Sequence, residues 1–134
     1  MRTIRTEAAP APVQGAPYSQ AAAAAPGDGE VVWVSGQLGI DPGDGTLVAD
    51  DVSEQTALAL RHIAAILAEA GGGLGDVVKT TVYLTDLAGD FPAMNEVYGR
   101  AFAGSAPARA TVGVAALPLG ASVEIEAVAV IRPR

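Results

Sequence analysis

The sequence predicts an α+β fold in which two helices pack on one face of a mixed β-sheet. Short runs of β-branched and aromatic residues, which are typical of strands, recur along the chain. Two longer segments between them carry apolar residues at the three- and four-residue spacing of a helix. Strands and helices in this order favour helices gathered on one side of the sheet. A length of 134 residues allows one domain, which we place at residues 1–134.

The N-terminal part of the chain is poor in structural signals. Residues 1–30 are rich in Ala, Pro and Gly, and this composition alone predicts a flexible arm. Val31–Val34 is a β-branched and aromatic run that ends at Ser35–Gly36 and predicts a buried strand. Asp41–Gly45 predicts a turn, because proline presets φ and glycine accepts positive φ.

The first helix is predicted from about Ser53 to Ala70. Asp51 or Ser53 can cap its N-terminus, and Gly71 is the expected stop. The helical period separates a buried from a solvent-facing side. The predicted buried residues are Leu60, Ile63, Ala64, Leu67 and Ala70, and the predicted outward residues are Arg61, His62 and Glu69.

A glycine-rich loop, Gly71–Gly75, leads from this helix to a strand predicted at Val77–Leu84. The loop lacks the pattern of a phosphate-binding loop, because Lys79 follows valine instead of glycine and no helix begins after it. Alternation along this strand predicts that two sets of side chains point to opposite faces of the sheet. One face would carry Val78, Thr80, Val82 and Leu84, and the opposite face would carry Lys79, Thr81 and Tyr83.

A second helix is predicted to begin near Asp90, with Pro92 in its first turn, where the missing N–H costs nothing. Its predicted buried stripe comprises Phe91, Met94, Tyr98, Ala101 and Phe102. Two strands then close the chain, at about Ala108–Ala115 and Ser122–Ile131, with Leu117–Gly120 as a hairpin-like turn between them.

Charged residues inside these last strands are candidates for function. Glu124 and Glu126 project from one face, which continues with the apolar Val128. A carboxylate on a partly apolar face must be paired, hydrogen-bonded or functional. Arg109 can bind a substrate carboxylate through two parallel hydrogen bonds, or it can form a structural ion pair with Glu124 or Glu126. Strand register decides between these roles, so both stay open here.

Composition excludes several classes of site. The chain has no Cys, which excludes disulfides, thiolate metal sites and cysteine nucleophiles. Its single His, His62, cannot form a multi-histidine metal centre within one chain, and we predict a solvated helix residue. A net charge of −7 argues against a nucleic-acid partner.

Hydropathy bears on location and association. No apolar run approaches the roughly 20 residues needed to cross a bilayer, so we expect no membrane partner and a cytoplasmic location. A mean hydropathy of +0.33 with few charged residues leaves much apolar surface to bury and favours association of subunits.

Motifs along the whole chain carry a family resemblance. They are PYSQA at 17–21, VSGQ at 34–37, DP at 41–42, GDVVKTTVYL at 75–84, FPAMNEVY at 91–98, PAR at 107–109, LP at 117–118 and VEIEA at 123–127. In this order they resemble the reactive intermediate deaminase family, the Rid or YjgF-type enamine/imine deaminases. The resemblance implies a chorismate-mutase-like fold assembled as a homotrimer with clefts between subunits.

The resemblance also implies an activity and its two catalytic residues. Family members hydrolyse reactive enamines and imines, such as 2-aminoacrylate, to 2-keto acids and ammonia, with no cofactor or metal. Arg109 would hold the substrate carboxylate. Glu124 would position and polarise the attacking water or exchange a proton with the substrate nitrogen, whereas Glu126 is expected to be a structural partner. An imine carbon is already electrophilic, so positioning and one activated water supply most of the catalysis.

Four further positions are implied to bind substrate. Tyr18 would line a cleft, so its segment would not be a flexible arm. Asn95 would help to shape the pocket and form hydrogen bonds in it. The backbone at Gly36 would approach the substrate, or glycine would permit a bulge there. The carbonyl of Thr111 would accept a hydrogen bond. Thr111 stands where the best-known deaminases have Cys, and Ala16 stands where Gly usually precedes Pro-Tyr.

Other functions stay open on the sequence alone. The same cleft would serve a non-catalytic protein that binds or senses small molecules such as 2-keto acids. A deaminase specific for a larger enamine, such as an aminomuconate-like metabolite, would share the same residues. A nuclease or translation-inhibiting role is disfavoured by the net charge of −7.

Overall fold

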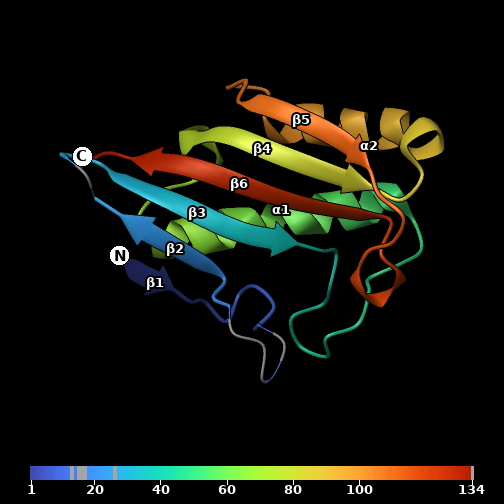
Figure 1. The fold of residues 1–134 in the computed structure, drawn as a ribbon, viewed down its shortest axis with the longest axis horizontal. Helices are drawn as coiled ribbons and strands as arrows, with labels where there is room; N and C mark the ends of the chain where they lie inside the picture. Colours follow the sequence, from blue (N-terminus) through green and yellow to red (C-terminus); the bar gives the residue numbers. More distant parts are fainter. Residues whose placement is uncertain (13, 15–17, 26, 134) are drawn as a thin grey trace.

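A single sheet forms one layer of the molecule, and both helices lie across one of its faces (Figure 1). The computed structural model describes residues 1–12, 14, 18–25 and 27–133. Within these residues the sheet has six strands in the order β1-β2-β3-β6-β4-β5, and only the β4–β5 pair is parallel. The predicted α+β class, with helices on one face of a mixed sheet, is therefore confirmed. The elements are β1 (Arg2–Ile4), β2 (Ala21–Ala24), β3 (Glu30–Gln37), α1 (Val52–Glu69), η1 (Leu74–Asp76), β4 (Val77–Leu84), α2 (Leu87–Ala101), β5 (Ala108–Gly113), η2 (Pro118–Gly120) and β6 (Val123–Ile131).

The N-terminal segment contributes two strands, so the flexible arm predicted from composition is wrong. β2 is a run of alanines that pairs antiparallel with β3, and β1 pairs with β2. Alanine has little intrinsic β preference, so the pairing with β3 supplies the order. The buried amide of Gln20 fastens the preceding loop, because its Nε2 donates to the carbonyls of Thr6, Ala9 and Pro10 at 2.8–3.1 Å.

Helix α1 lies within one residue of its predicted bounds. The side chain of Asp51 caps it by accepting from the Ser53 amide at 2.9 Å, and Gly71 ends it with a φ of 88°. Leu60, Ile63 and Leu67 are buried as predicted, whereas Ala64 and Ala70 are half-buried.

The prediction for His62 is wrong. Its side chain is 2% exposed, and Nε2 donates to the carbonyl of Ile40 at 2.6 Å. Burial lowers the pKa of this imidazole, against the raising effect of the Ile40 carbonyl. The loop after β3 covers this side of α1, which a helical period alone does not reveal.

Strand β4 matches its predicted bounds, with one residue misplaced. The pairing of β4 with β6 shifts by one residue between Val77 and Lys79. This bulge turns Val78 outward, so Val78 is 47% exposed and does not share the buried face of Thr80 and Val82.

Helix α2 begins earlier than predicted. Asp86 caps it and Leu87 is its first residue, so Pro92 lies inside the helix and not in its first turn. The predicted buried stripe is confirmed for Met94, Tyr98 and Phe102. Phe91 is half-buried and Ala101 is exposed.

The predicted hairpin between the last two strands is wrong. β4 lies between β5 and β6 and pairs with both. Arg109 stands opposite Thr80 on β4, which stands opposite Ala127 on β6. Directly paired residues share a face of the sheet, so Arg109 lies on the face of Ala127, which is the helix face.

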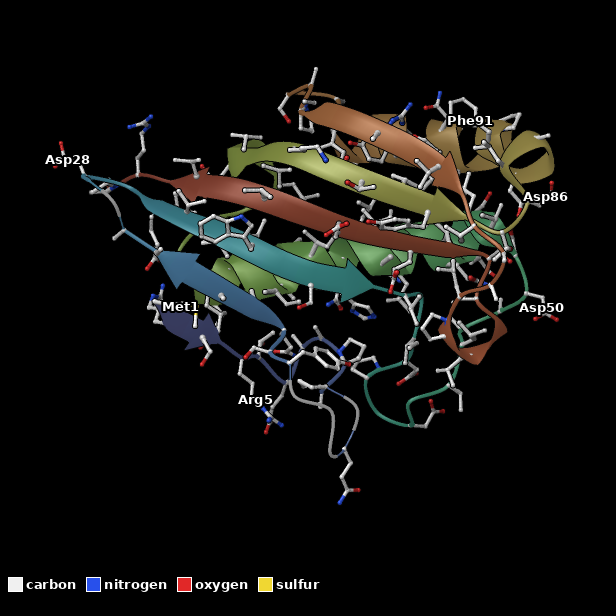
Figure 2. All side chains as sticks on the ribbon, in the orientation of Figure 1. Met1, Arg5, Asp28, Asp50, Asp86 and Phe91 are labelled. Carbon is white, nitrogen blue, oxygen red and sulfur yellow. The ribbon has the colours of Figure 1, made fainter. Side chains whose placement is uncertain are left out.

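The sheet faces differ in how far they are covered. The core lies between the helices and the sheet and includes Ile63, Ile66, Val82 and Ile125. Side chains on the other face stand clear of the helices (Figure 2), and Trp33 remains 49% exposed there. Among the described residues, neither helix combines the length and the apolar character needed to cross a membrane.

Candidate active site

A cavity of about 640 Å³ lies at the end of the sheet where β3 and β6 meet the loops. Its lining includes Tyr18, Gly36 and Glu124, three of the residues that the sequence predicted for the site, together with Ser35 and Glu126. Figure 1 shows why distant segments meet there, since the loop after β3 and the connection that contains η2 descend side by side.

A β-bulge forms one wall of this cavity. Val34 pairs with Ala127 and Gln37 pairs with Ile125, so Ser35 and Gly36 together face one residue of β6. The bulge that glycine was predicted to permit is present. The Ser35 hydroxyl donates to the carbonyl of Ser19 at 2.6 Å and ties the bulge to the segment of Tyr18.

Gly36 leaves room for the carboxylate of Glu124. A Cβ atom at position 36 would lie 2.8 Å from both Cδ and Oε1 of Glu124. Real Cβ atoms do not approach other atoms this closely, so any larger residue would displace the carboxylate. The structure thus brings Gly36 and Glu124 into direct contact.

The electrostatics of the cavity raise the pKa of Glu124. Burial raises the pKa of this carboxyl, and the negative charge of Glu126 raises it further. The hydroxyl of Tyr83 donates to Glu126, and this hydrogen bond raises the pKa of Tyr83. Glu126 therefore has the structural hydrogen bond expected of it, in this case from a tyrosine.

Arg109 belongs to a second group of residues, on α2 and β5. Its Nη1 donates to Oδ1 of Asn95 at 2.9 Å. Its Cζ lies 4.7 Å from the ring centroid of Tyr98 and 5.6 Å from that of Phe91, within the range of cation–π contacts. A guanidinium carries five N–H donors, so donors remain to bind a carboxylate.

The predicted site residues thus fall into two groups that one chain does not bring together. Thr111 stands opposite the buried Val82 and shares the helix face with Arg109. Glu124 stands opposite Tyr83, on the other face of the sheet. The alternative of an ion pair between Arg109 and Glu124 or Glu126 within the chain is therefore wrong, because the sheet separates them.

The sequence prediction missed one residue that lines the cavity, Leu119, and one that contacts a lining residue, Tyr83. Tyr83 was placed on the polar face of its strand, but its contact with Glu126 required the β4–β6 pairing. Leu119 lines the cavity with a φ of 59°, a conformation that costs residues with a Cβ about 1–2 kcal/mol. Only the Leu-Gly sequence of the turn hinted at it.

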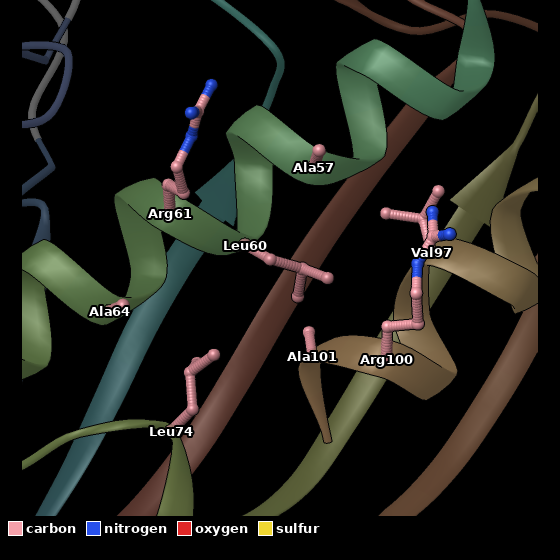
Figure 3. Close-up of a pocket in the computed structure, with 8 residues that line it drawn as sticks. All are labelled: Ala57, Leu60, Arg61, Ala64, Leu74, Val97, Arg100 and Ala101. Atoms are coloured by element: carbon pink, nitrogen blue, oxygen red, sulfur yellow. The ribbon is translucent and has the colours of Figure 1, made fainter. Parts of the chain in front are cut away.

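Two other features define what the described residues offer. No group of three or more His, Cys, Asp or Glu among them could hold a metal ion. A separate groove of about 380 Å³ lies between α1 and α2 (Figure 3) and includes Leu60, Val97 and Arg100. It contains none of the predicted site residues.

Comparison with known proteins places the chain in a family. The model of the family described as Endoribonuclease L-PSP matches residues 6–131. A mouse 2-iminobutanoate/2-iminopropanoate deaminase is 46% identical to the chain, covering 98% of this chain and 93% of its own. The chain belongs to the Rid (L-PSP) family. A RutC family protein from Pyrococcus abyssi is 49% identical over 94% of each chain.

Solved structures of the Rid family have the same fold. The structure of Escherichia coli TdcF with bound serine matches with a TM-score of 0.86 and 38% identity, covering 99% of this chain and all of TdcF. Of the two departures from the Rid pattern, Thr111 lies in β5, whereas Ala16 lies outside the described residues.

Proposed function

We propose that this Rid protein is an enamine/imine deaminase that converts 2-imino acids to 2-keto acids and ammonia. The observation that carries the proposal is the 46% identity over 98% of the chain to a 2-iminobutanoate/2-iminopropanoate deaminase. The proposed substrate class includes 2-iminopropanoate, the tautomer of 2-aminoacrylate. One water is consumed for each ammonia released, and neither carbon nor nitrogen changes oxidation state.

The proposed site forms between copies of the chain. Arg109 and Glu124 lie on opposite faces of one sheet, so Glu124 of one copy would meet Arg109 of its neighbour. The partly apolar open face, where Trp33 is 49% exposed, supports burial against another copy. The family resemblance implies three copies, and a head-to-tail contact repeated around a ring closes such an assembly.

Arg109 is proposed to bind the carboxylate of the substrate. Two parallel N–H donors of a guanidinium match the two oxygens of a carboxylate. Asn95 accepts from Nη1, and Tyr98 lies under the guanidinium, so both limit its rotation. A held carboxylate fixes the position of the adjacent imine carbon, and this positioning accounts for much of the rate enhancement expected of such a site.

Glu124 is proposed to hold the attacking water. As the water oxygen bonds to the imine carbon, the C=N electron pair moves to nitrogen, and Glu124 passes the proton from water to that nitrogen. Glu124 then passes the hydroxyl proton of the carbinolamine to its amino nitrogen, the C=O bond forms, and the C–N bond breaks with release of ammonia. A carboxyl whose pKa is raised can both accept and donate a proton in this sequence.

The proposed function also indicates the size of the ligand and the cellular location of the protein. TdcF binds serine, a small amino acid with a free carboxylate, which supports a small carboxylate-bearing ligand in the same fold. We infer a cytoplasmic protein whose partners are such ligands and further copies of itself, with no nucleic acid or membrane partner and no cofactor.

The test generates 2-aminoacrylate from serine with a pyridoxal-phosphate dehydratase and follows pyruvate formation above the spontaneous rate. Arg109→Ala should abolish the acceleration. Arg100→Ala is the matched control, because Arg100 is an arginine of α2 that lines the separate groove between the helices, and its side chain is 70% exposed and paired with Glu96. Unchanged activity of Arg109→Ala would contradict the assigned role.

Other outcomes would identify the alternatives. Tight binding of 2-keto acids without turnover of any enamine would indicate a binding or sensing protein, and turnover of only a large, aminomuconate-like enamine would indicate a pathway-specific deaminase. Degradation of RNA that persists in Arg109→Ala and Glu124→Gln would indicate a ribonuclease. A solution mass of 13.4 kDa, that of one chain, would contradict the assembly.

A further inference from the structure

Leu119 combines two features that the fold does not require. It is the only residue other than glycine with a positive φ among the described residues, at 59°, and its side chain is 62% exposed. Glycine would adopt this backbone conformation without strain. The Leu119 side chain also lies outside the buried core, so neither the turn nor the core accounts for leucine. Strained, exposed residues of this kind cluster at ligand sites.

The position of Leu119 indicates what its side chain contacts. Leu119 lines the same cavity as Glu124, together with Leu38, Ile40 and Pro118. In the proposed function the reacting carbon of the substrate lies next to Glu124. These apolar side chains would therefore form a wall of the cavity close to that carbon. The cavity volume of about 640 Å³ exceeds the space that a three-carbon imino acid fills.

The orientation of a bound 2-imino acid follows from its chemistry. Its C2 carries three substituents, namely the carboxylate, the nitrogen and the side chain. With the carboxylate on Arg109 of the neighbouring copy and C2 next to Glu124, the substrate side chain is the group left to face the apolar wall.

We propose that Leu119 is a specificity-determining residue that binds the aliphatic side chain of the substrate, so that the enzyme prefers branched or long aliphatic 2-imino acids to 2-iminopropanoate. This inference rests on the proposed function. The ligand class is a 2-imino acid with four or more side-chain atoms, such as the imine formed when leucine or methionine is oxidised at its α-carbon.

The test compares a short and a long substrate. A D-amino-acid oxidase converts D-alanine or D-leucine to the imine, with O₂ as the oxidant and with catalase present to remove the peroxide. Semicarbazide traps the imine that escapes hydrolysis, so deaminase activity lowers semicarbazone formation. In the wild type, kcat/KM should be higher for the leucine-derived imine than for 2-iminopropanoate.

Leu119→Gly removes the side chain in a conformation that glycine adopts freely, so the variant is expected to fold. It should lower kcat/KM for the leucine-derived imine by about tenfold, the effect of lost contacts in an apolar pocket, and change that for 2-iminopropanoate by less than about twofold. Leu119→Met, which keeps a large apolar side chain, should retain the preference that Leu119→Gly loses. Leu87→Ala is the control, because Leu87 is 40% exposed at the start of α2 and outside the cavity.

An unchanged substrate ratio in Leu119→Gly would overturn the proposal. If the assembly mass of that variant changed as well, Leu119 would be assigned to the contact between copies. Calorimetry with the corresponding 2-keto acids separates this question from catalysis. Preferential binding of 4-methyl-2-oxopentanoate over pyruvate, lost in Leu119→Gly, would uphold the role of Leu119 even if no imine were hydrolysed and the proposed function failed.

Discussion

Replacing Gly36 by alanine should damage catalysis far more than folding. The Cβ of alanine would lie 2.8 Å from Cδ and Oε1 of Glu124, whereas unstrained carbon contacts are about 3.5–4.0 Å long. The carboxylate must therefore move by about 1 Å. A displacement of this size at a reacting group costs on the order of 100-fold in rate, so kcat/KM for imine hydrolysis should fall by about 10- to 100-fold.

The cost to stability should be small. The atoms displaced belong to the end of a flexible side chain, and Gly36 has no positive φ that alanine would strain. Alanine also restricts the unfolded chain, which favours folding by about 0.4–1 kcal/mol. We therefore expect the free energy of unfolding to change by less than about 1 kcal/mol, or a few degrees in Tm.

Imine hydrolysis and thermal unfolding measured on the same preparation test this prediction. Gly99→Ala is the matched control, because a Cβ added at Gly99 in α2 would meet nothing within 4 Å beyond the neighbouring backbone of its own helix. A Gly36→Ala variant with full activity would refute the reasoning that Glu124 must occupy the position seen in the structure. A Gly36→Ala variant with a much lower Tm and a normal rate of imine hydrolysis would show that Gly36 serves the fold instead.

Three further predictions concern neighbouring groups. Glu126→Gln removes the charge that raises the pKa of Glu124, so the limb of the pH–rate profile that reports Glu124 should move to lower pH; an unmoved limb would remove Glu126 from this role. Asn95→Ala frees the guanidinium of Arg109, so KM should rise roughly 3- to 10-fold with little change in kcat; an unchanged KM would contradict the positioning of Arg109 by Asn95. Because burial lowers the pKa of His62, the unfolded state binds its proton first, and stability should fall as pH drops below about 6.5. Thermal unfolding of His62→Gln between about pH 7.5 and 5.5 should therefore show a smaller fall in Tm than the wild type, and an equal fall would contradict the assignment.

Local sequence patterns predicted where helices and strands begin and end better than they predicted which residues pack against them. The bounds of α1 and β4 follow from caps, glycines and β-branched runs, all of which act within a few residues. The exposure of His62 does not, because the loop that covers it is fixed by contacts with distant segments. Similarly, the alanines of β2 become a strand only by pairing with β3, which intrinsic preferences do not encode.

The candidate site shows the same division. The motifs pointed to Arg109, Glu124 and Gly36, and the structure places Gly36 and Glu124 in contact. The relation between Arg109 and Glu124 depended on sheet order, which local sequence does not determine. The register of β4 with β5 and with β6 puts them on opposite faces and makes assembly between copies the central question.

Mixed assemblies test most directly the claim that the site is shared between copies. Arg109→Ala and Glu124→Gln chains, each inactive alone, are co-expressed with different tags and purified by both. In the proposed trimer, each mixed assembly would contain one interface where an intact Arg109 meets an intact Glu124, so activity should return to about one third of the wild type. Mixed trimers that remain inactive would contradict the shared site.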